Sequence, residues 1–258
     1  MICSLNNFSR VLAASKTTIL LCLSVVFFFA STAPGVSAQK RFSKTYPATK
    51  NVRLQLLNRS GTVTVEGWDR QEISVQAYLD APAANIAPQS LSGTINIDLV
   101  KDNQGRTGVG NVNFHIRVPR YSSVDIETRI GNLSVTNVSG GLVRSVISTE
   151  GDIELTNIAA IAVDAQNGIG NIFFDGEIRS GGKYRFTSMR GSINLRIPFE
   201  SSFSLVATAP STRNISLGSF SHPGMTTLDG RRVTGRFGGG GSSLTVTNQR
   251  GTIAFIRR

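Results

Sequence analysis

Residues 131–155 read GNLSVTNVSGGLVRSVISTEGDIEL, and they contain one structural unit followed by the start of the next. The unit is a glycine followed by polar, apolar, polar and apolar residues. It recurs along the chain, with central glycines at 131, 151, 170 and 191, at spacings of 20, 19 and 21 residues. A fixed period of this length is typical of repeat architectures in which each unit stacks on its neighbours.

The positions before each glycine repeat as well. The residues seven and five places earlier are apolar and the residue three places earlier is small and polar, as in Leu54, Leu56 and Asn58 before Gly61. Each unit therefore predicts two short alternating strands joined at a corner, with apolar side chains from both facing one interior. Arg144 breaks this pattern. A bulge that turns it outward and a core end open to water both remain possible.

The glycines are predicted to be structural corners. A corner between two strands needs positive φ or close approach of a neighbouring chain, and a Cβ would obstruct either. The corner glycines are Gly61, Gly131, Gly151, Gly170, Gly191 and Gly251. Stacked coils of this kind predict an all-β, β-solenoid-like fold forming a single domain.

Residues 1–38 are predicted to be a signal peptide. Basic residues precede an apolar run over 19–30, which is shorter than the ~20 residues of a membrane span, and small residues permit cleavage after Ala38. Both cysteines, Cys3 and Cys22, lie in this segment. The remaining domain, residues 39–258, therefore has no disulfide, no thiolate nucleophile and no sulfur-ligated metal. Its predicted location is the periplasm, the cell surface or the extracellular space.

From about Phe42 to Arg258 the sequence resembles the bacterial putative-adhesin repeat domain, a family of unknown function. The resemblance rests on Tyr46-Pro47, on the stretch NRSGTVTVEGWDR over 58–70, on the Gly-Asp-Ile repeats and on the glycine-rich turn before Gly251. It implies a β-solenoid-like fold exported to the cell envelope. The family has no catalytic motif that could be transferred to this chain.

The residues themselves indicate no enzyme and no cofactor. The sequence has no nucleophile elbow, zinc-protease or phosphate-loop motif. Glu150, Asp152 and Glu154 alternate onto one predicted outward face. Three such carboxylates are typical of a solvated surface, although weak cation binding and the acid and base roles of a carbohydrate-active β-helix enzyme remain alternatives.

Charge is unevenly distributed. Residues 179–258 carry twelve basic and two acidic side chains, a net charge of +10, whereas residues 39–178 carry thirteen and fourteen, a net charge of −1. A basic end on an exported domain would attract anionic polysaccharide or lipid head groups, or would serve solubility and protection of strand edges. Arg231, Arg232 and Arg236 are the predicted anion-binding residues, within a flexible loop expected over 219–241.

These observations predict a non-catalytic cell-envelope protein with an adhesin-like or scaffolding domain. Nucleic acid is not an expected partner, because the exported chain has no recognisable binding module. The sequence indicates neither the ligand nor the oligomeric state.

Overall fold

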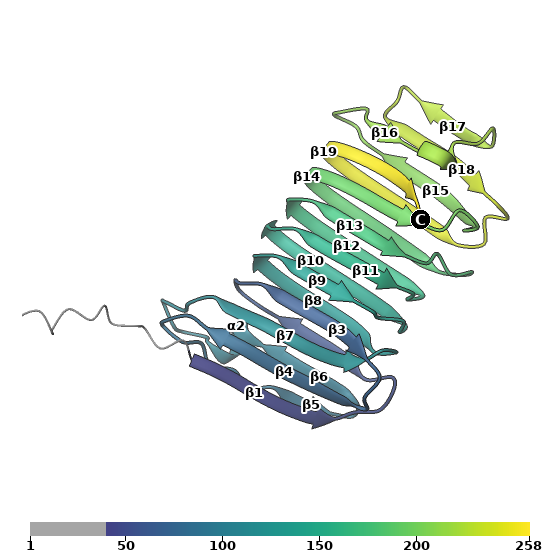
Figure 1. Ribbon diagram of the computed structural model, residues 1–258. Coiled ribbons are helices and arrows are strands. Elements are labelled where there is room, and N and C mark those ends of the chain that lie inside the picture. The colour runs from purple at the N-terminus through teal and green to yellow at the C-terminus, as the bar shows by residue number, and fades with distance from the viewer. Residues whose placement is uncertain (1–39) are drawn as a thin grey trace, which may run out of the picture. The chain divides into compact units, whose positions relative to one another are not determined.

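The computed structural model describes residues 40–258, and the predicted signal peptide and its cleavage position lie outside this range. The described chain is almost entirely β-structure (Figure 1). Its elements are β1 (Lys40–Pro47), β2 (Arg53–Leu57), β3 (Val63–Trp68), β4 (Glu72–Leu79), β5 (Gln89–Leu91), β6 (Thr94–Asp98), α2 (Leu99–Asp102), β7 (Val112–Pro119), β8 (Ser123–Ile130), β9 (Leu133–Thr136), β10 (Leu142–Glu150), β11 (Ile153–Ile158), β12 (Ala162–Ile169), β13 (Ile172–Gly176), β14 (Lys183–Ile197), β15 (Phe203–Thr208), β16 (Ile215–Ser216), the 3₁₀ turn η1 (Gly218–Phe220), β17 (Met225–Leu228), β18 (Arg232–Phe237) and β19 (Ser243–Arg257).

The strands form a β-solenoid, as predicted, in which successive coils stack in parallel (Figure 1). The first strand of each coil belongs to sheet 1, in the order β5, β6, β2, β8, β10, β12, β14, β19, β15, β18, β17. The second strand belongs to sheet 2, in the order β1, β4, β7, β3, β9, β11, β13, β14, β19, β16. The long strands β14 and β19 contribute their first halves to sheet 1 and their second halves to sheet 2.

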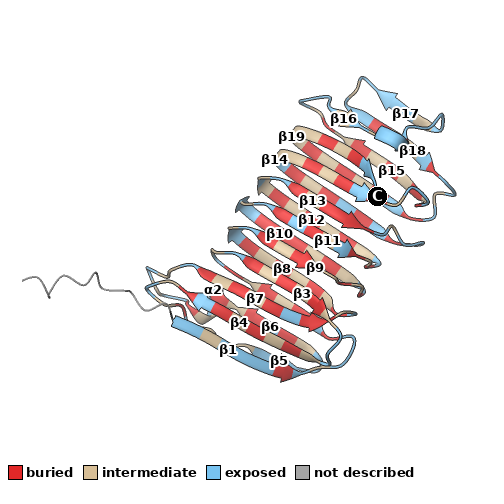
Figure 2. Ribbon diagram, in the orientation of Figure 1, coloured by how far each residue is buried: buried red, intermediate tan, exposed pale blue. Residues whose placement is uncertain are grey.

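The core lies between the inward faces of the two sheets. Alternate residues of each strand are buried, which gives the striped burial pattern in Figure 2. Parallel pairing places Ile153 of β11 between Leu133 of β9 and Ile172 of β13, so equivalent apolar side chains of successive coils stack on one another. Each such side chain contributes about 1.5–3 kcal/mol when fully buried. One coil could not offset its own conformational entropy, but the stack can.

The corner between the two sheets is made by glycine. Gly151 has φ 148°, and a Cβ on it would overlap the carbonyl oxygen of Gly131 in the neighbouring coil. Gly251 lacks positive φ, yet its Cβ would overlap the carbonyl oxygen of Gly191 in the same way. The glycine positions therefore form a column in which the backbone of one coil rests directly against the next.

Two polar ladders hold this column together. On the inner side, Asn167 Nδ2 donates to the carbonyl of Gly151 at 2.7 Å, and Asn248 Nδ2 donates to that of Gly191 at 2.7 Å. On the outer side, Asn132, Asp152 and Asn171, each directly after a corner glycine, accept a backbone N–H of the next coil. Asn132 Oδ1 accepts from the Asp152 N–H at 3.0 Å, and Asp152 Oδ1 accepts from the Asn171 N–H at 2.6 Å. These bonds fix the coils in register.

The spatial order of the coils differs from their order in the sequence. The coil β2–β3 lies between β6–β7 and β8–β9, although it precedes both in the chain. At the other end, β19 lies between β14 and the strands β15 and β16. Two further alternating strands, β4 and β7, lie outside the regular glycine period. Of these, β4 lies near the end of sheet 2, and β7 belongs to a coil inside the stack.

A β-bulge explains Arg144. The pairing of β10 with β8 and β12 shifts between Ile147 and Glu150, so this coil has one more residue before its corner than the others. Of the two explanations that the sequence left open for Arg144, the bulge is the one confirmed, whereas the inward placement of Val146 and Ser148 by counting back from Gly151 was wrong by one residue. Val143, Ser145 and Ile147 take those positions, and Arg144 points outward.

The loop predicted over residues 219–241 is also wrong. This segment contains the end of η1 and the antiparallel strands β17 and β18, and β18 pairs with β15 at the end of sheet 1. Phe220 and Phe237 from this segment are buried, with ring centroids 5.1 Å apart. The glycines and the proline make turns between short strands here.

The corner geometry predicts unequal effects for neighbouring substitutions. Gly151→Val places a side chain against the carbonyl of Gly131, and Ile153→Asp puts an unpaired charge in the core, so each should lower the free energy of unfolding by at least about 3 kcal/mol. Glu154→Gln alters an exposed side chain and should change it by no more than about 0.5 kcal/mol. Urea melts of the three variants would measure this. A Glu154→Gln effect equal to that of Ile153→Asp would overturn the assigned inward and outward faces.

Candidate functional site

The outer surface of sheet 1 carries a regular grid of polar side chains. Residues on alternate positions point outward, and the parallel register aligns them in rows that cross the strands. One row runs through Asp125 of β8, Arg144 of β10, Asp164 of β12, Arg185 of β14 and Thr245 of β19. The charges on this grid differ between its two halves.

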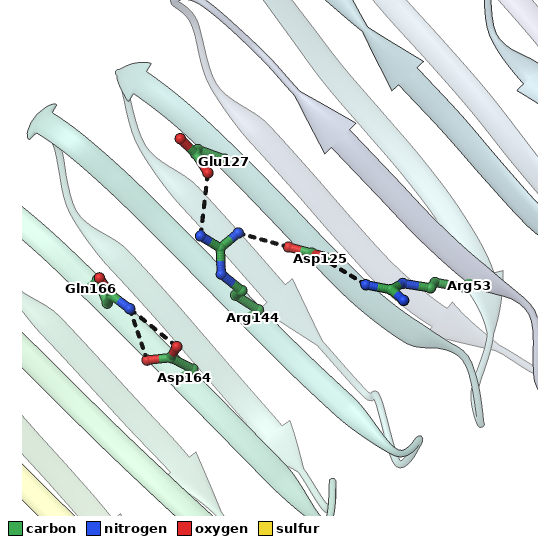
Figure 3. A network of polar contacts seen from close by, with 6 residues as sticks. All are labelled: Arg53, Asp125, Glu127, Arg144, Asp164 and Gln166. Atoms are coloured by element: carbon green, nitrogen blue, oxygen red, sulfur yellow. Dashed lines mark hydrogen bonds and ion pairs between the residues drawn. The ribbon is translucent and has the colours of Figure 1, made fainter.

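In the half built by β2, β8 and β10, Arg53 and Arg144 are paired with carboxylates (Figure 3), whereas Arg129 of β8 is exposed and forms no ion pair within residues 40–258. Asp125 accepts from Arg53 Nη2 at 3.1 Å and from Arg144 Nη1 at 2.9 Å. Arg144 Nη2 also donates to Glu127 at 3.3 Å. The hydrogen bond to Asp125 raises the pKa of the Arg144 guanidinium above its ordinary value, against the opposing effect of partial burial.

Asp164 on β12 marks the boundary between the two halves. Its carboxylate accepts from Gln166 Nε2 at 3.1 and 3.2 Å (Figure 3). A shallow hollow beside it is lined by side chains of β12, β14 and β19, among them Asp164, Lys183, Arg185 and Ser243. Beyond this hollow, no further carboxylate lies on the described outer surface of sheet 1 from β14 to β18.

The half built by β14, β19, β15 and β18 carries unpaired cations. We call Lys183, Arg185, Arg232 and Arg236 the basic strip; all four are exposed. Within residues 40–258 none of their side chains forms an ion pair or a hydrogen bond. Most of the other outward residues bear hydroxyl groups: Thr187, Ser204, Thr208, Thr234, Ser243, Thr245 and Thr247; the remaining ones are Gln249 and the apolar Met189 and Val206.

The grid fixes the spacing of these cations. Lys183, Ser243, Ser204 and Arg236 lie in one row on four adjacent strands, so the first and last are about 14 Å apart across the sheet. Arg232 and Arg236 are four residues apart on β18, about 13 Å along the strand. Cations spaced in this way fit an extended ligand that carries several separated negative charges.

The structure places the predicted anion-binding residues in two settings. Arg232 and Arg236 lie on the outer face of β18, and Arg231 lies in the turn between β17 and β18, where its N–H donates to the Leu228 carbonyl at 2.9 Å. All three are exposed. Lys183 and Arg185 were not predicted as part of the site. Their alternation with buried Tyr184 and Phe186 was visible in the sequence, but the strands that would join them to β18 were not.

The structure does not bring the three carboxylates singled out in the sequence, Glu150, Asp152 and Glu154, together into one site. Glu150 ends β10 in sheet 1, Glu154 belongs to β11 in sheet 2, and Asp152 lies at the corner between them. Asp152 is engaged in the outer ladder through the Asn171 N–H. Across residues 40–258 no group of three or more histidine, cysteine or carboxylate side chains could hold a metal ion.

Comparison with known families gives a match over residues 38–254, nearly the whole described domain. The chain belongs to the Toastrack DUF4097 family. The Toastrack fold is a β-solenoid, in agreement with the stacked coils described above.

Three solved structures are similar to this chain to different degrees. A putative cell adhesion protein from Clostridium sporogenes ATCC 15579 is 12% identical, with a TM-score of 0.50 over 85% of this chain and all of that chain. A putative adhesin from Bacteroides fragilis NCTC 9343 is 13% identical, with a TM-score of 0.34 over 84% of this chain and 97% of that chain. A putative lipid binding protein from Parabacteroides distasonis ATCC 8503 is 8% identical, with a TM-score of 0.33 over 84% of this chain and 94% of that chain.

Two further findings complete the comparison. A search of curated proteins finds no match to this Toastrack chain. Among residues 40–258, no helix has the length and apolar character needed to span a bilayer.

Substitution of Asp152 tests whether its carboxylate is structural. Asp152→Asn keeps an oxygen that can accept the Asn171 N–H, as Asn132 does one coil earlier, so the melting temperature should hardly change. Asp152→Ala leaves that N–H without its partner and should cost about 1–2 kcal/mol in urea unfolding. Glu150→Gln, on an exposed side chain, is the control. A loss in Asp152→Asn as large as in Asp152→Ala would show that the negative charge itself is needed.

Proposed function

We propose that this Toastrack protein is a non-catalytic, exported cell-envelope protein whose basic strip binds anionic polysaccharide. The proposal rests on the difference in ion pairing between the two halves of the outer surface of sheet 1. Arg53 and Arg144 are held by carboxylates, whereas Lys183, Arg185, Arg232 and Arg236 on the same sheet face have none.

The character of the strip favours a sugar polymer over a membrane. Hydroxyl-bearing residues separate the cations, and such side chains can donate to and accept from sugar hydroxyls. An interfacial membrane site would instead carry a continuous apolar face to insert between the lipids, whereas the apolar outward residues here, Met189, Val206 and Leu228, lie on three different strands among polar side chains. A flat, stiff sheet also loses little conformational entropy when it binds an extended chain.

The carboxylates do not favour the alternative of a carbohydrate-active enzyme. Glycoside hydrolysis needs two carboxyl groups flanking one bond. Glu150 and Glu154 lie on different sheets, and Asp152 between them accepts a backbone N–H. Export to the periplasm, the cell surface or the extracellular space is part of the proposal and rests on the predicted signal peptide.

Charge reversal of Arg232 and Arg236 in the basic strip, together with Arg231 in the adjoining turn, tests the proposed binding surface. Arg231→Glu, Arg232→Glu and Arg236→Glu together should weaken binding to polygalacturonate by about tenfold or more, since three exposed charge contacts of roughly 0.2–1 kcal/mol each are lost and replaced by repulsion. Wild-type affinity should fall as salt rises, because such contacts are screened beyond ~8 Å at physiological ionic strength. Isothermal titration at several salt concentrations measures both effects.

A matched control has the same change in net charge. Lys50→Glu, Arg59→Glu and Arg129→Glu alter three exposed basic residues outside the strip and should leave the affinity close to wild type. Melting temperatures of both triple variants exclude unfolding as the cause. Equal loss in the two variants would mean that overall charge, not the strip, attracts the polymer. If the protein binds anionic phospholipid vesicles more tightly than polygalacturonate, the proposed polysaccharide ligand is wrong and a lipid surface is the ligand instead.

A further inference from the structure

A second hollow, of about 280 Å³, lies on the outer surface of sheet 1, where β2, β8 and the bulge of β10 come together. This volume is near the lower end of the ~300–1,000 Å³ that is typical of small-molecule sites. None of the four residues of the basic strip lines it, so it is separate from the proposed polysaccharide surface. Its lining includes Leu57, Arg59, Val100, Glu127, Arg129 and Ser148. We call it the β2–β8 hollow.

The hollow exists because the regular strand pattern ends on both sides of β2 and β8. On one side, β6 pairs with β2 as far as Asp98 and Leu57, and the chain then turns into α2, so Val100 lies where a further strand residue would be. On the other side, the bulge of β10 puts an extra residue opposite Arg129, and the small side chain of Ser148 lines the hollow. A bulge bends its strand locally.

Two arginines without partners line the hollow side by side. Arg59 and Arg129 occupy equivalent positions in neighbouring coils, because β2 and β8 keep their parallel register up to the bridge between Ser60 and Ile130. Neighbouring strands lie ~4.8 Å apart. Both side chains are exposed, and within residues 40–258 neither guanidinium forms an ion pair or a hydrogen bond. Like charges held side by side repel each other, and an anion bound between them relieves the repulsion.

The carboxylate in the hollow does not neutralise these arginines. Glu127 accepts from Arg144 Nη2 at 3.3 Å (Figure 3). Arg144 is the register partner of Asp125, which lies on the far side of Glu127 from Arg129 along β8. The Glu127 carboxylate is therefore directed away from Arg129, and its charge is already paired.

Apolar side chains form the rest of the wall. Leu57 is half-buried, and Val100 is 45% exposed. A sugar ring placed against them would lose hydrogen bonds from its hydroxyl groups to water without replacement. An alkyl chain would instead gain roughly 25 cal/mol for each Å² of apolar surface removed from water. The wall therefore favours a ligand with an apolar chain over a sugar.

We propose that the β2–β8 hollow binds a small amphiphilic anion. Arg59 and Arg129 hold its single carboxylate or phosphate group, and Leu57 and Val100 contact the apolar chain attached to that group. Guanidinium groups suit this role because they present parallel N–H donors to the oxygens of a carboxylate or phosphate. The site goes beyond the proposed function, whose ligand is a polymer with many charges.

NMR titration of the whole chain with small probes tests the site. The backbone amide signal of Ser148 reports binding in the hollow in every variant. At least one of hexanoate and hexyl phosphate should bind about tenfold or more tightly than hexanol, which has no charge, and galacturonate, which has no apolar chain. Arg59→Gln with Arg129→Gln should weaken that binding by about tenfold, because both charged contacts are lost. Val100→Ser should weaken it several-fold.

A matched control separates the hollow from the charge of the corner. Arg190 and Arg250 are also exposed register partners on adjacent strands, but they do not line this hollow. Arg190→Gln with Arg250→Gln should leave the affinity at the wild-type value. Melting temperatures show that all variants are folded. If neither hexanoate nor hexyl phosphate binds more tightly than hexanol and galacturonate, or if the control pair weakens binding as much as the Arg59 and Arg129 pair, the proposed site is wrong.

Discussion

The corner contact between successive coils is the interaction on which the rest of this structure depends. A glycine in one coil lies against the carbonyl of the glycine in the next, as Gly151 does on Gly131, and any side chain there would push the coils apart. The amide of buried Asn167 donates to the carbonyl of Gly151, the carbonyl against which Gly170 of the next coil lies. Because the contact joins backbone to backbone, it fixes the register of two sheets at once.

Register is what turns a simple sequence pattern into a surface with chemical character. With the coils aligned, one phase of every strand packs in the core and the other forms rows across the outside. Along the row that begins at Asp125, acidic and basic groups alternate as far as Arg185 and then give way to Thr245. The proposed polysaccharide site begins where that alternation stops, so its position follows from the stacking of the coils.

The sequence predicted what depends on local pattern. The corner positions, the inward phase of most strands and the β-solenoid class follow from a glycine period and from alternation, which each coil repeats. For Arg144 the sequence left a bulge and an open core end as alternatives, because a count from Gly151 shows a break in the pattern but does not locate an inserted residue. The strands within residues 219–241 were not predicted, because the glycines and the proline of this segment are typical of loops. Burial of Val233 and Phe237 against β15 nevertheless makes part of the segment a strand.

The candidate site was predictable only in part, for a related reason. Arg232 and Arg236 could be selected from the charge imbalance, but Lys183 and Arg185 join them only because β19 inserts between β14 and β15. Parallel strands with the same pattern are interchangeable as neighbours, so their spatial order is set by long-range packing that no local signal encodes.

Side-chain footprinting with and without polygalacturonate tests the central claim most directly. Arginine and lysine modification, read by mass spectrometry of peptides, reports the accessibility of each cation separately. The account predicts that the polymer protects Lys183, Arg185, Arg232 and Arg236, whereas Arg59 and Arg129 stay as reactive as in the free protein. Equal protection at all of these positions, or protection confined to Arg59 and Arg129, would contradict it.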